Sequence, residues 1–175
     1  MSADAGEQVL FSEKEIARRI RALARRIARK ALRPQIASPV LAGAFIFAAD
    51  LLRALRREGL DLETEFLWLR SYGRSENPGE VMVLAGPTEL VRGRTVLLID
   101  GVLDRGRTLA RAKELLEEAG AASVMSAVVV AKASPNALFR ADYALFEAGE
   151  EFLYGYGMDR SGLGRGLPDI RVRKS

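Results

Sequence analysis

The sequence predicts an α/β fold, a mostly parallel sheet flanked by helices, and three observations support this. Apolar segments of strand length alternate with amphipathic segments of helix length along the chain, the pattern of β-α-β units with helices on both faces of a sheet. Val96 to Ile99 is an uninterrupted apolar run, typical of a strand buried on both faces. No repeat or Pro/Ser-rich linker divides the 175 residues. We therefore predict a single domain, residues 1–175, with residues 1–10 disordered and residues 148–175 forming a separate tail.

The N-terminal part is predicted to begin with an amphipathic helix over residues 12–31. Ser12 and Glu15 have capping-box spacing, and Phe11 precedes them as a hydrophobic staple. One apolar stripe follows at steps of four and three residues, formed by Ile16, Ile20, Leu23 and Ile27. The opposite face carries the arginines Arg18, Arg19, Arg21, Arg25, Arg26 and Arg29. Such a face suits solvent, which is the preferred interpretation, or a polyanion such as RNA or a membrane surface.

A short strand, a helix and a hairpin are predicted next. The strand, residues 39–41, leads through Ala42 and Gly43 into a helix that ends at Gly59. Residues 63–70 and 80–84 are expected to pair as a long, open hairpin. The connection between them is rich in turn-forming residues, which predicts a flexible loop.

The most informative segment is a strand, loop and helix. The strand, residues 95–100, ends in Asp100, and a helix is expected from residue 109 to residue 119. The loop between them, residues 104–108, would present several backbone N–H groups at the positive end of the helix dipole, which makes an anion-binding site. Asp100 and Asp104 flank this loop. Acids beside phosphate-binding amides predict chemistry on a phosphorylated substrate.

Two further strands complete the expected sheet, residues 123–132 and 142–146. The first ends in Lys132. Ligands of parallel sheets gather beyond the carboxyl ends of the strands. Lys132, the loop at residues 104–108 and the pair Ala42-Gly43 all follow such ends, so we expect them to share one site.

Composition narrows the chemistry. The chain has no cysteine and no histidine, which excludes disulfides, thiolate catalysis, a Ser-His-Asp triad and imidazole metal sites. Proton transfer must then use carboxylate, lysine or tyrosine, and a metal would have oxygen ligands, as Mg²⁺ does. The N-terminus does not resemble a secretory signal, and the longest uncharged run, residues 34–49, is shorter than the roughly 20 apolar residues of a membrane span. We expect a cytoplasmic protein without membrane contact.

From Phe11 to Val172 the sequence resembles the hypoxanthine-guanine phosphoribosyltransferase family, which belongs to the type I phosphoribosyltransferases. The resemblance is carried by the segment Val96 to Leu109, by Lys132 at the end of a strand, and by the tail Phe152 to Asp159. It implies the type I phosphoribosyltransferase fold, with a small hood formed by the two ends of the chain. It also implies purine salvage, in which hypoxanthine or guanine and phosphoribosyl pyrophosphate give IMP or GMP and pyrophosphate.

The resemblance also implies roles for individual residues. Asp104 is the implied catalytic residue, as general base or hydrogen-bond partner of the purine. The sugar phosphate would contact Asp100, Asp104, Arg105, Gly106, Arg107 and Thr108, and the pyrophosphate would contact Ala42, Gly43, Ser71, Tyr72 and Arg165. The purine would contact Lys132, Phe152, Leu153 and Asp159. Mg²⁺ is the implied cofactor, near Asp100 and Asp159. A cis peptide at Ala42-Gly43 and a homodimer or homotetramer are implied as well.

Three departures from the family pattern leave alternatives open. Gly101 stands where the family has a second acid, Arg105 replaces a threonine, and Arg160 replaces an aromatic residue. An active salvage enzyme is the preferred hypothesis. The alternatives are an enzyme with another base preference, such as xanthine, and a catalytically weakened homologue that acts as a nucleotide- or RNA-binding regulatory protein. If the second acid is simply missing, Gly101→Asp should tighten the binding of phosphoribosyl pyrophosphate.

Overall fold

The computed structural model describes residues 7–71, 81–134 and 136–173. Its main sheet has the strand order β5-β4-β2-β6-β7-β8, with β3 paired to β2 outside this path. The strands are β2 (Ile36–Leu41), β3 (Glu63–Thr64), β4 (Leu67–Ser71), β5 (Val81–Ala85), β6 (Thr95–Leu103), β7 (Ser123–Lys132) and β8 (Tyr143–Ala148). All neighbours run parallel except β4 and β5, which form the predicted antiparallel hairpin. The predicted α/β class is confirmed.

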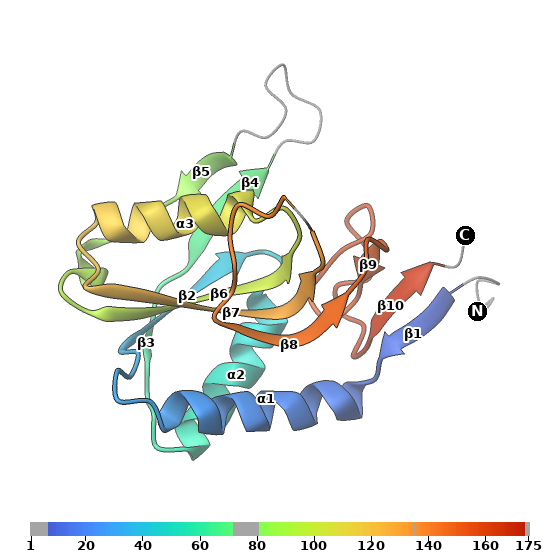
Figure 1. Cartoon of the computed structure of the whole chain (residues 1–175), viewed down its shortest axis with the longest axis horizontal. Coiled ribbons are helices and arrows are strands. Elements are labelled where there is room, and N and C mark those ends of the chain that lie inside the picture. Colours follow the sequence, from blue (N-terminus) through green and yellow to red (C-terminus); the bar gives the residue numbers. More distant parts are fainter. Residues whose placement is uncertain (1–6, 72–80, 135, 174–175) are drawn as a thin grey trace.

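Helices cover both faces of this sheet (Figure 1). They are α1 (Glu13–Ala28), α2 (Phe45–Arg57) and α3 (Arg107–Glu118), and a short 3₁₀ helix η1 (Glu89–Val91) precedes β6. The apolar stripe of α1 packs with α2 in one core, and α3 packs in a second core on the other face of the sheet. Among the described residues, no helix combines the length and the apolar character that a membrane crossing requires.

A second, smaller sheet joins the two ends of the described chain. Its antiparallel order is β1-β10-β9, with β1 (Glu7–Phe11), β10 (Ile170–Arg173) and β9 (Leu153–Tyr154). Figure 1 shows it beside the main sheet, where the family resemblance implied a hood. The prediction of disorder over residues 1–10 is wrong from Glu7 onward, because these residues pair with a strand at the other end of the sequence. Residues 1–6 lie outside the described part of the chain.

The start of α1 follows the predicted capping box. The Ser12 N–H donates to the Glu15 side chain at 3.0 Å, and the Glu15 N–H donates to the Ser12 hydroxyl at 3.4 Å. The predicted apolar stripe is buried, with Ile16 and Ile27 at 1% and 0% exposure. Local chemistry therefore determines where this helix begins and which face it buries.

Two strands extend beyond their predicted ends. Strand β2 begins at Ile36, so Pro39 lies inside it. On one side β2 pairs with β3 up to Ala37 and with β4 from Val40, so Pro39 falls in the interval between these two neighbours. Strand β6 continues past Asp100 to Leu103, because its pairing with β7 runs through to Leu103.

Candidate active site

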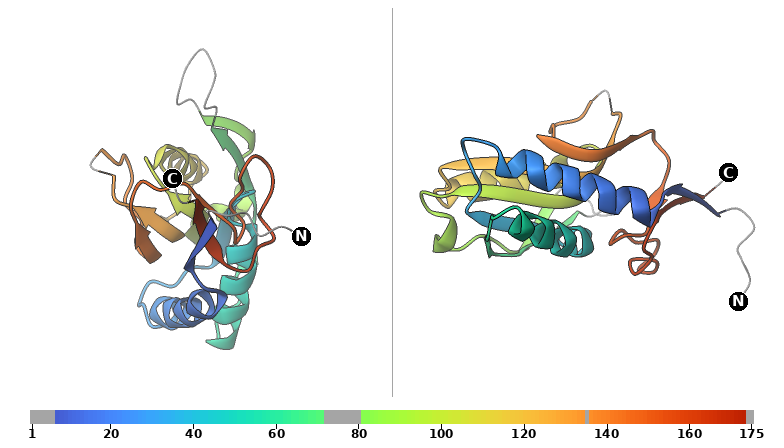
Figure 2. Two further views of the ribbon diagram at one scale, coloured as in Figure 1. Left: turned by 90° about the vertical axis from the view of Figure 1, so that its right-hand side faces the viewer. Right: turned by 90° about the horizontal axis from the view of Figure 1, so that it is seen from below.

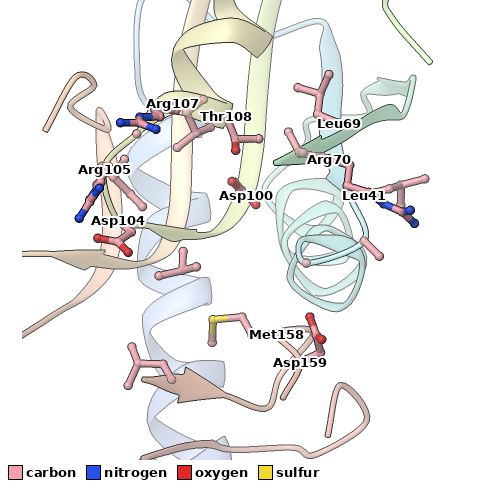
Figure 3. Close-up of a pocket in the computed structure, with 18 of the residues that line it drawn as sticks. Leu41, Leu69, Arg70, Asp100, Asp104, Arg105, Arg107, Thr108, Met158 and Asp159 are labelled. Carbon is pink, nitrogen blue, oxygen red and sulfur yellow. The ribbon is translucent and has the colours of Figure 1, made fainter. Parts of the chain in front are cut away.

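A pocket of about 650 Å³ opens where the carboxyl ends of β2, β4, β6 and β7 meet the tail that follows β9 (Figure 3). It brings together the predicted site residues Ala42, Gly43, Asp100, Asp104, Arg105, Gly106, Arg107, Thr108, Lys132, Phe152, Leu153, Asp159 and Arg165. Tyr72 lies outside the described residues, as does the side chain of Ser71, which ends β4. The predicted convergence of three strand ends on one site is therefore found in the described structure.

Sequence reasoning missed part of the wall. Trp68 and Arg70 line the pocket from β4, and Met158 lines it from the tail. The available signal was that Trp68 and Arg70 lie near the end of a predicted strand, residues 63–70, because ligands of parallel sheets gather beyond the carboxyl ends of the strands. Figure 3 shows Met158 and Asp159 on the tail, across the pocket from Asp100 and Thr108.

The loop before α3 has the geometry of an anion site. Gly106 has φ of 80°, a left-handed conformation that favours glycine, and α3 begins at Arg107. Arg107 therefore starts the helix two residues earlier than predicted. The first N–H groups of a helix have no partner within it, and they lie at the positive end of the helix dipole. The side chains of Arg105 and Arg107 extend from this segment and add positive charge at the pocket (Figure 3).

A neighbouring loop supports the same segment. The Leu138 N–H donates to the Arg105 carbonyl at 2.9 Å. A Cβ atom on Gly106 would lie 2.6 Å from Phe139 Cβ and 2.9 Å from the Phe139 nitrogen. This contact, in addition to the left-handed φ, requires glycine at position 106. The loop between β7 and β8 thus fixes the position of the loop that is expected to bind phosphate.

Asp100 is an acid in an unusual environment. Burial raises its pKa from 3.8 to about 7, and the hydrogen bond that its Oδ1 accepts from the Gly101 N–H, at 2.7 Å, partly offsets this rise. The carboxyl group therefore changes charge near neutral pH in the ligand-free protein. A bound cation would favour its ionised form.

Gly101 has a steric role that the sequence did not reveal. A Cβ atom there would lie 2.9 Å from the Gly43 carbonyl oxygen and 3.3 Å from Met158 Cγ. A Cβ atom on Gly157, whose φ is 95°, would lie 2.4 Å from the same oxygen. Strand β6, the loop after β2 and the tail thus meet through backbone atoms at Gly43. An aspartate at position 101 would displace this contact. We therefore expect Gly101→Asp to weaken substrate binding, and not to tighten it.

The loop after β2 contains a cis peptide bond. It joins Leu41 and Ala42, one bond earlier than the Ala42-Gly43 bond that the resemblance implied. Both residues line the pocket.

The base side of the pocket is formed by the end of β7 and by the tail. Lys132 is the last residue of β7, half-buried at the pocket. Phe152 is 57% exposed, so one face of its ring is free to stack on a flat ligand. Leu153 beside it is buried and belongs to β9.

Asp159 and Arg165 contact each other within the tail. Arg165 Nη2 lies 2.7 Å from Asp159 Oδ1, and Arg165 Nη1 donates to the Gly157 carbonyl at 2.7 Å. The other Asp159 oxygen accepts a hydrogen bond from the Gly162 N–H at 2.8 Å. The turn that carries both residues is therefore ordered by its own polar contacts, and a ligand that binds either side chain must compete with this ion pair.

Arg160, the third departure, fastens the tail to the first strand. Its Nη1 lies 2.8 Å from Glu7 Oε1, and its guanidinium lies 4.6 Å from the centre of the Tyr154 ring. Glu7 also contacts Arg171 at 3.4 Å. Arg160, which directly follows Asp159, thus connects the tail to β1.

The acids of the site fit a metal that arrives with a substrate. In the described ranges, no group of three or more His, Cys, Asp or Glu residues could hold a metal ion. Asp100 and Asp159 line the pocket from β6 and from the tail. Mg²⁺ usually binds one or two carboxylates together with substrate phosphates and waters. The residues present match that arrangement.

Comparison with known proteins adds independent information. Residues 8–160 match the family described as phosphoribosyl transferase domain. The hypoxanthine-guanine phosphoribosyltransferase of Bacillus subtilis is 34% identical over 96% of this chain and 93% of its own length. The enzyme of the same name from Aquifex aeolicus is 32% identical over 93% of this chain and 92% of its own. The bifunctional protein TilS/HprT of Listeria innocua is 36% identical, and the chain spans only about a quarter, 26%, of its length.

Solved structures agree with these relatives. The hypoxanthine phosphoribosyltransferase of Trypanosoma cruzi, in complex with the product IMP, superimposes with a TM-score of 0.86 and 32% identity, over 99% of this chain and 97% of the other.

Proposed function

The chain belongs to the phosphoribosyltransferase family, and within it to the hypoxanthine-guanine phosphoribosyltransferases; on that premise we propose that its pocket transfers the phosphoribosyl group from phosphoribosyl pyrophosphate to hypoxanthine or guanine. The observation that carries this proposal is the convergence of the loop at residues 104–108, Lys132 and Phe152 on one pocket. One end of that pocket suits a phosphate, and the other suits a flat base. A nucleotide product contains both groups.

The phosphate end would be bound mainly by backbone N–H groups. The loop that ends at Gly106 and the first turn of α3 present these groups at the positive end of the helix dipole. Thr108 and the two nearby arginines, Arg105 and Arg107, add a hydroxyl and two cations. Asp104, exposed at the start of the loop, would accept or share the proton of the purine nitrogen that attacks the sugar.

The base end would be read by a cation and a ring. Lys132 would donate to the O6 atom of a 6-oxopurine, and Phe152 would stack on its face. Adenine has an amino group in place of O6, so the lysine would lose its acceptor. A buried donor without an acceptor costs about 1–3 kcal/mol, which favours hypoxanthine and guanine.

The leaving pyrophosphate would lie near Gly43, Arg165 and the two acids. Mg²⁺ bound to the substrate would neutralise charge on the pyrophosphate as it leaves. Asp100 and Asp159 would orient that ion from the two sides of the pocket. Arg165 would exchange its ion pair with Asp159 for the pyrophosphate oxygens, and Asp159 would then be available to the metal's water shell.

We also propose that the protein forms a homodimer, through an apolar surface on the β4–β5 hairpin. Large apolar side chains are exposed there, between 38% and 49%: Phe66, Trp68, Met82, Val83 and Leu84. Several large apolar side chains exposed on one hairpin favour an interaction surface there. Because Trp68 also lines the pocket, the interface would adjoin the active site. A homotetramer would need a second surface. The cytoplasmic location stays a prediction.

The regulatory alternative has less support. Two arginines of the α1 face serve the fold: Arg19 donates to the Leu145 carbonyl at 2.6 Å and lies 4.5 Å from the centre of the Phe146 ring, and Arg26 lies 5.3 Å from the centre of the Tyr143 ring. The comparisons likewise favour an enzyme.

The test is a turnover assay with phosphoribosyl pyrophosphate, Mg²⁺ and each of hypoxanthine, guanine, xanthine and adenine. We expect nucleotide formation with hypoxanthine or guanine and very little with adenine. Absence of product with all four bases, together with measurable nucleotide binding, would favour the regulatory alternative.

A further inference from the structure

A second cavity, of about 520 Å³, lies between α1 and α2 and is bordered by residues 166–168 of the tail. Figure 2 shows these two helices next to each other, with the tail near one end of the pair. None of the residues that line this cavity lines the candidate active site. Its volume lies within the range of about 300–1,000 Å³ that small-molecule sites have.

The lining combines apolar side chains with charged ones: Arg21 and Arg57, the ion pair of Arg53 with Asp50, and Glu13. Ala17, Ile46 and Leu167 contribute partly exposed apolar surface, whereas Ile16, Ile20 and Ala54 are at most 4% exposed. Arg21 of α1 and Arg57 of α2 also line the cavity, and within the described residues neither guanidinium has an ion pair, a hydrogen bond or a ring contact. Cations beside a concave apolar surface suit an organic molecule with one anionic group, because both of its parts then find partners.

The cavity also borders the part of the tail that directly precedes Met158 and Asp159. Tyr156 lines it and is 4% exposed, and its hydroxyl donates to Asp50 Oδ2 at 2.6 Å. The Tyr156 N–H donates to the Leu167 carbonyl at 3.0 Å, and Leu167 lines the same cavity. Only Gly157 separates Tyr156 from Met158, which lines the active site. A molecule that contacts Tyr156 and Leu167 would therefore change the position of the segment that carries Met158 and Asp159.

We propose that this cavity is an effector site for a small organic anion, whose apolar body contacts Ala17, Ile46 and Leu167, whose anionic group binds Arg21 and Arg57, and whose binding changes the affinity of the purine site. The effect on the purine site rests on the proposed transferase function. The binding of the anion does not.

Binding is tested with 8-anilino-1-naphthalenesulfonate, which has an aromatic body and one sulfonate. IMP is present at a saturating concentration, established by calorimetry, so that the active site is filled. We expect saturable fluorescence with one site per chain. The double variant Arg21→Gln/Arg57→Gln should bind at least about tenfold more weakly, because it loses both charged partners.

Two controls separate this site from general attraction to a basic protein. The variant Arg18→Gln/Arg25→Gln removes the same amount of charge, from two exposed arginines on α1 that do not line the cavity. It should bind the dye like the wild type. Ala17→Phe fills the cavity without any change of charge and should abolish binding. Equal binding by all four proteins, or no saturable binding by the wild type, would overturn the site.

The link to the purine site is tested by the KM for hypoxanthine, with and without saturating dye. We expect a change of about fivefold, typical of coupling between two sites, and no change in Arg21→Gln/Arg57→Gln. Saturable binding with an unchanged KM would overturn the coupling. If the wild type makes no IMP at all, the proposed function fails instead, and the binding titration without IMP still decides the site.

Discussion

The two sides of the pocket are held in place by different forces. The phosphate side is set by burial: Val96 to Ile99 of β6 have no exposed surface, and the loop at Gly106 packs against Phe139. The base side combines burial, since Leu153, Tyr156 and Met158 of the tail belong to a core, with polar contacts of the tail, Arg165 with Asp159 and Arg160 with Glu7. Polar contacts therefore contribute more on the base side than on the phosphate side.

Two of the three departures from the pattern that the resemblance implied, Gly101 and Arg105, lie on the phosphate side, and the third, Arg160, lies on the tail. On the phosphate side the ligand is expected to meet backbone N–H groups, so the side chain at Arg105 is free to change while the backbone keeps its path. On the base side the ligand is expected to meet the side chains of Lys132 and Phe152, and these match the family.

The largest expected effect tests whether any side chain on the phosphate side is indispensable. Asp104→Asn should lower kcat at least about tenfold, because an amide cannot take the purine proton, while the Tm stays unchanged because Asp104 is exposed. Asp61→Asn, at an exposed acid that does not line the pocket, serves as the control in the same steady-state assay. An unchanged kcat would remove Asp104 from the mechanism.

The counterpart on the base side is Lys132→Met. We expect the KM for hypoxanthine to rise about tenfold, since loss of a hydrogen bond to a charged group costs about 1.5–3 kcal/mol. The KM for phosphoribosyl pyrophosphate should be unaffected. Lys113→Met on the outer surface of α3 is the matched variant. A rise in both KM values would show that the two sides are not independent.

Gly101→Asp tests whether Gly101 only marks the loss of an acid or is required by the close packing of the backbone. The new Cβ would lie 2.9 Å from the Gly43 carbonyl oxygen, and such overpacking typically costs about 1–3 kcal/mol. We expect a lower Tm and a KM for phosphoribosyl pyrophosphate raised about fivefold, within that energy range. Tighter substrate binding would show instead that the glycine merely lacks an acid.

Burial of Asp100 on the phosphate side should also make the free energy of unfolding depend on pH. Because burial raises the pKa of Asp100 to about 7, the folded protein keeps a proton there that the unfolded chain releases above about pH 4. The stabilisation from this group is complete below pH 4 and is lost as the pH rises towards 7. Asp100→Asn should therefore gain up to about 4 kcal/mol relative to the wild type between pH 4 and pH 8, because each unit of pKa shift corresponds to about 1.4 kcal/mol. Denaturant unfolding of the ligand-free proteins at several pH values measures this, and parallel curves would contradict it.

The smallest effect is expected where the tail is fastened to the first strand. Glu7→Gln weakens the contacts with Arg160 and Arg171. A partly exposed ion pair is worth up to about 1 kcal/mol, so the KM for hypoxanthine should rise about twofold, with kcat unchanged. Glu114→Gln, which removes an exposed contact with Arg111 on α3, is the control. A change in the KM for phosphoribosyl pyrophosphate alone would argue against the proposed role of this contact.

Local patterns predicted much of this architecture. The capping box at Ser12, the apolar run before Asp100 and the end of β7 at Lys132 all depend on neighbouring residues, and the structure confirms them. The contacts that could not be predicted join distant segments. Glu7 and Arg171 are 164 residues apart in sequence, and nothing near either residue indicates a strand partner.

The candidate site divides in the same way. The predicted strand ends indicated that Asp100, Asp104 and Lys132 would gather in the pocket, and the family resemblance added Phe152, Asp159 and Arg165. The contact of Gly101 and Gly157 with the Gly43 carbonyl depends on the distance between three backbones, which no residue type encodes. The sequence alone does not distinguish a glycine that has replaced a functional acid from a glycine that close packing requires.

The pairing of β1 with β10 also has a practical consequence. Glu7 and Arg173 are opposite one another in that ladder, so a short linker could join them and the chain could be reopened at a surface turn, such as Gly120–Ala121. A circular permutant of this kind would retain both sheets. Its turnover would report directly on whether continuity of the chain, or only proximity of the segments, is needed to assemble the pocket.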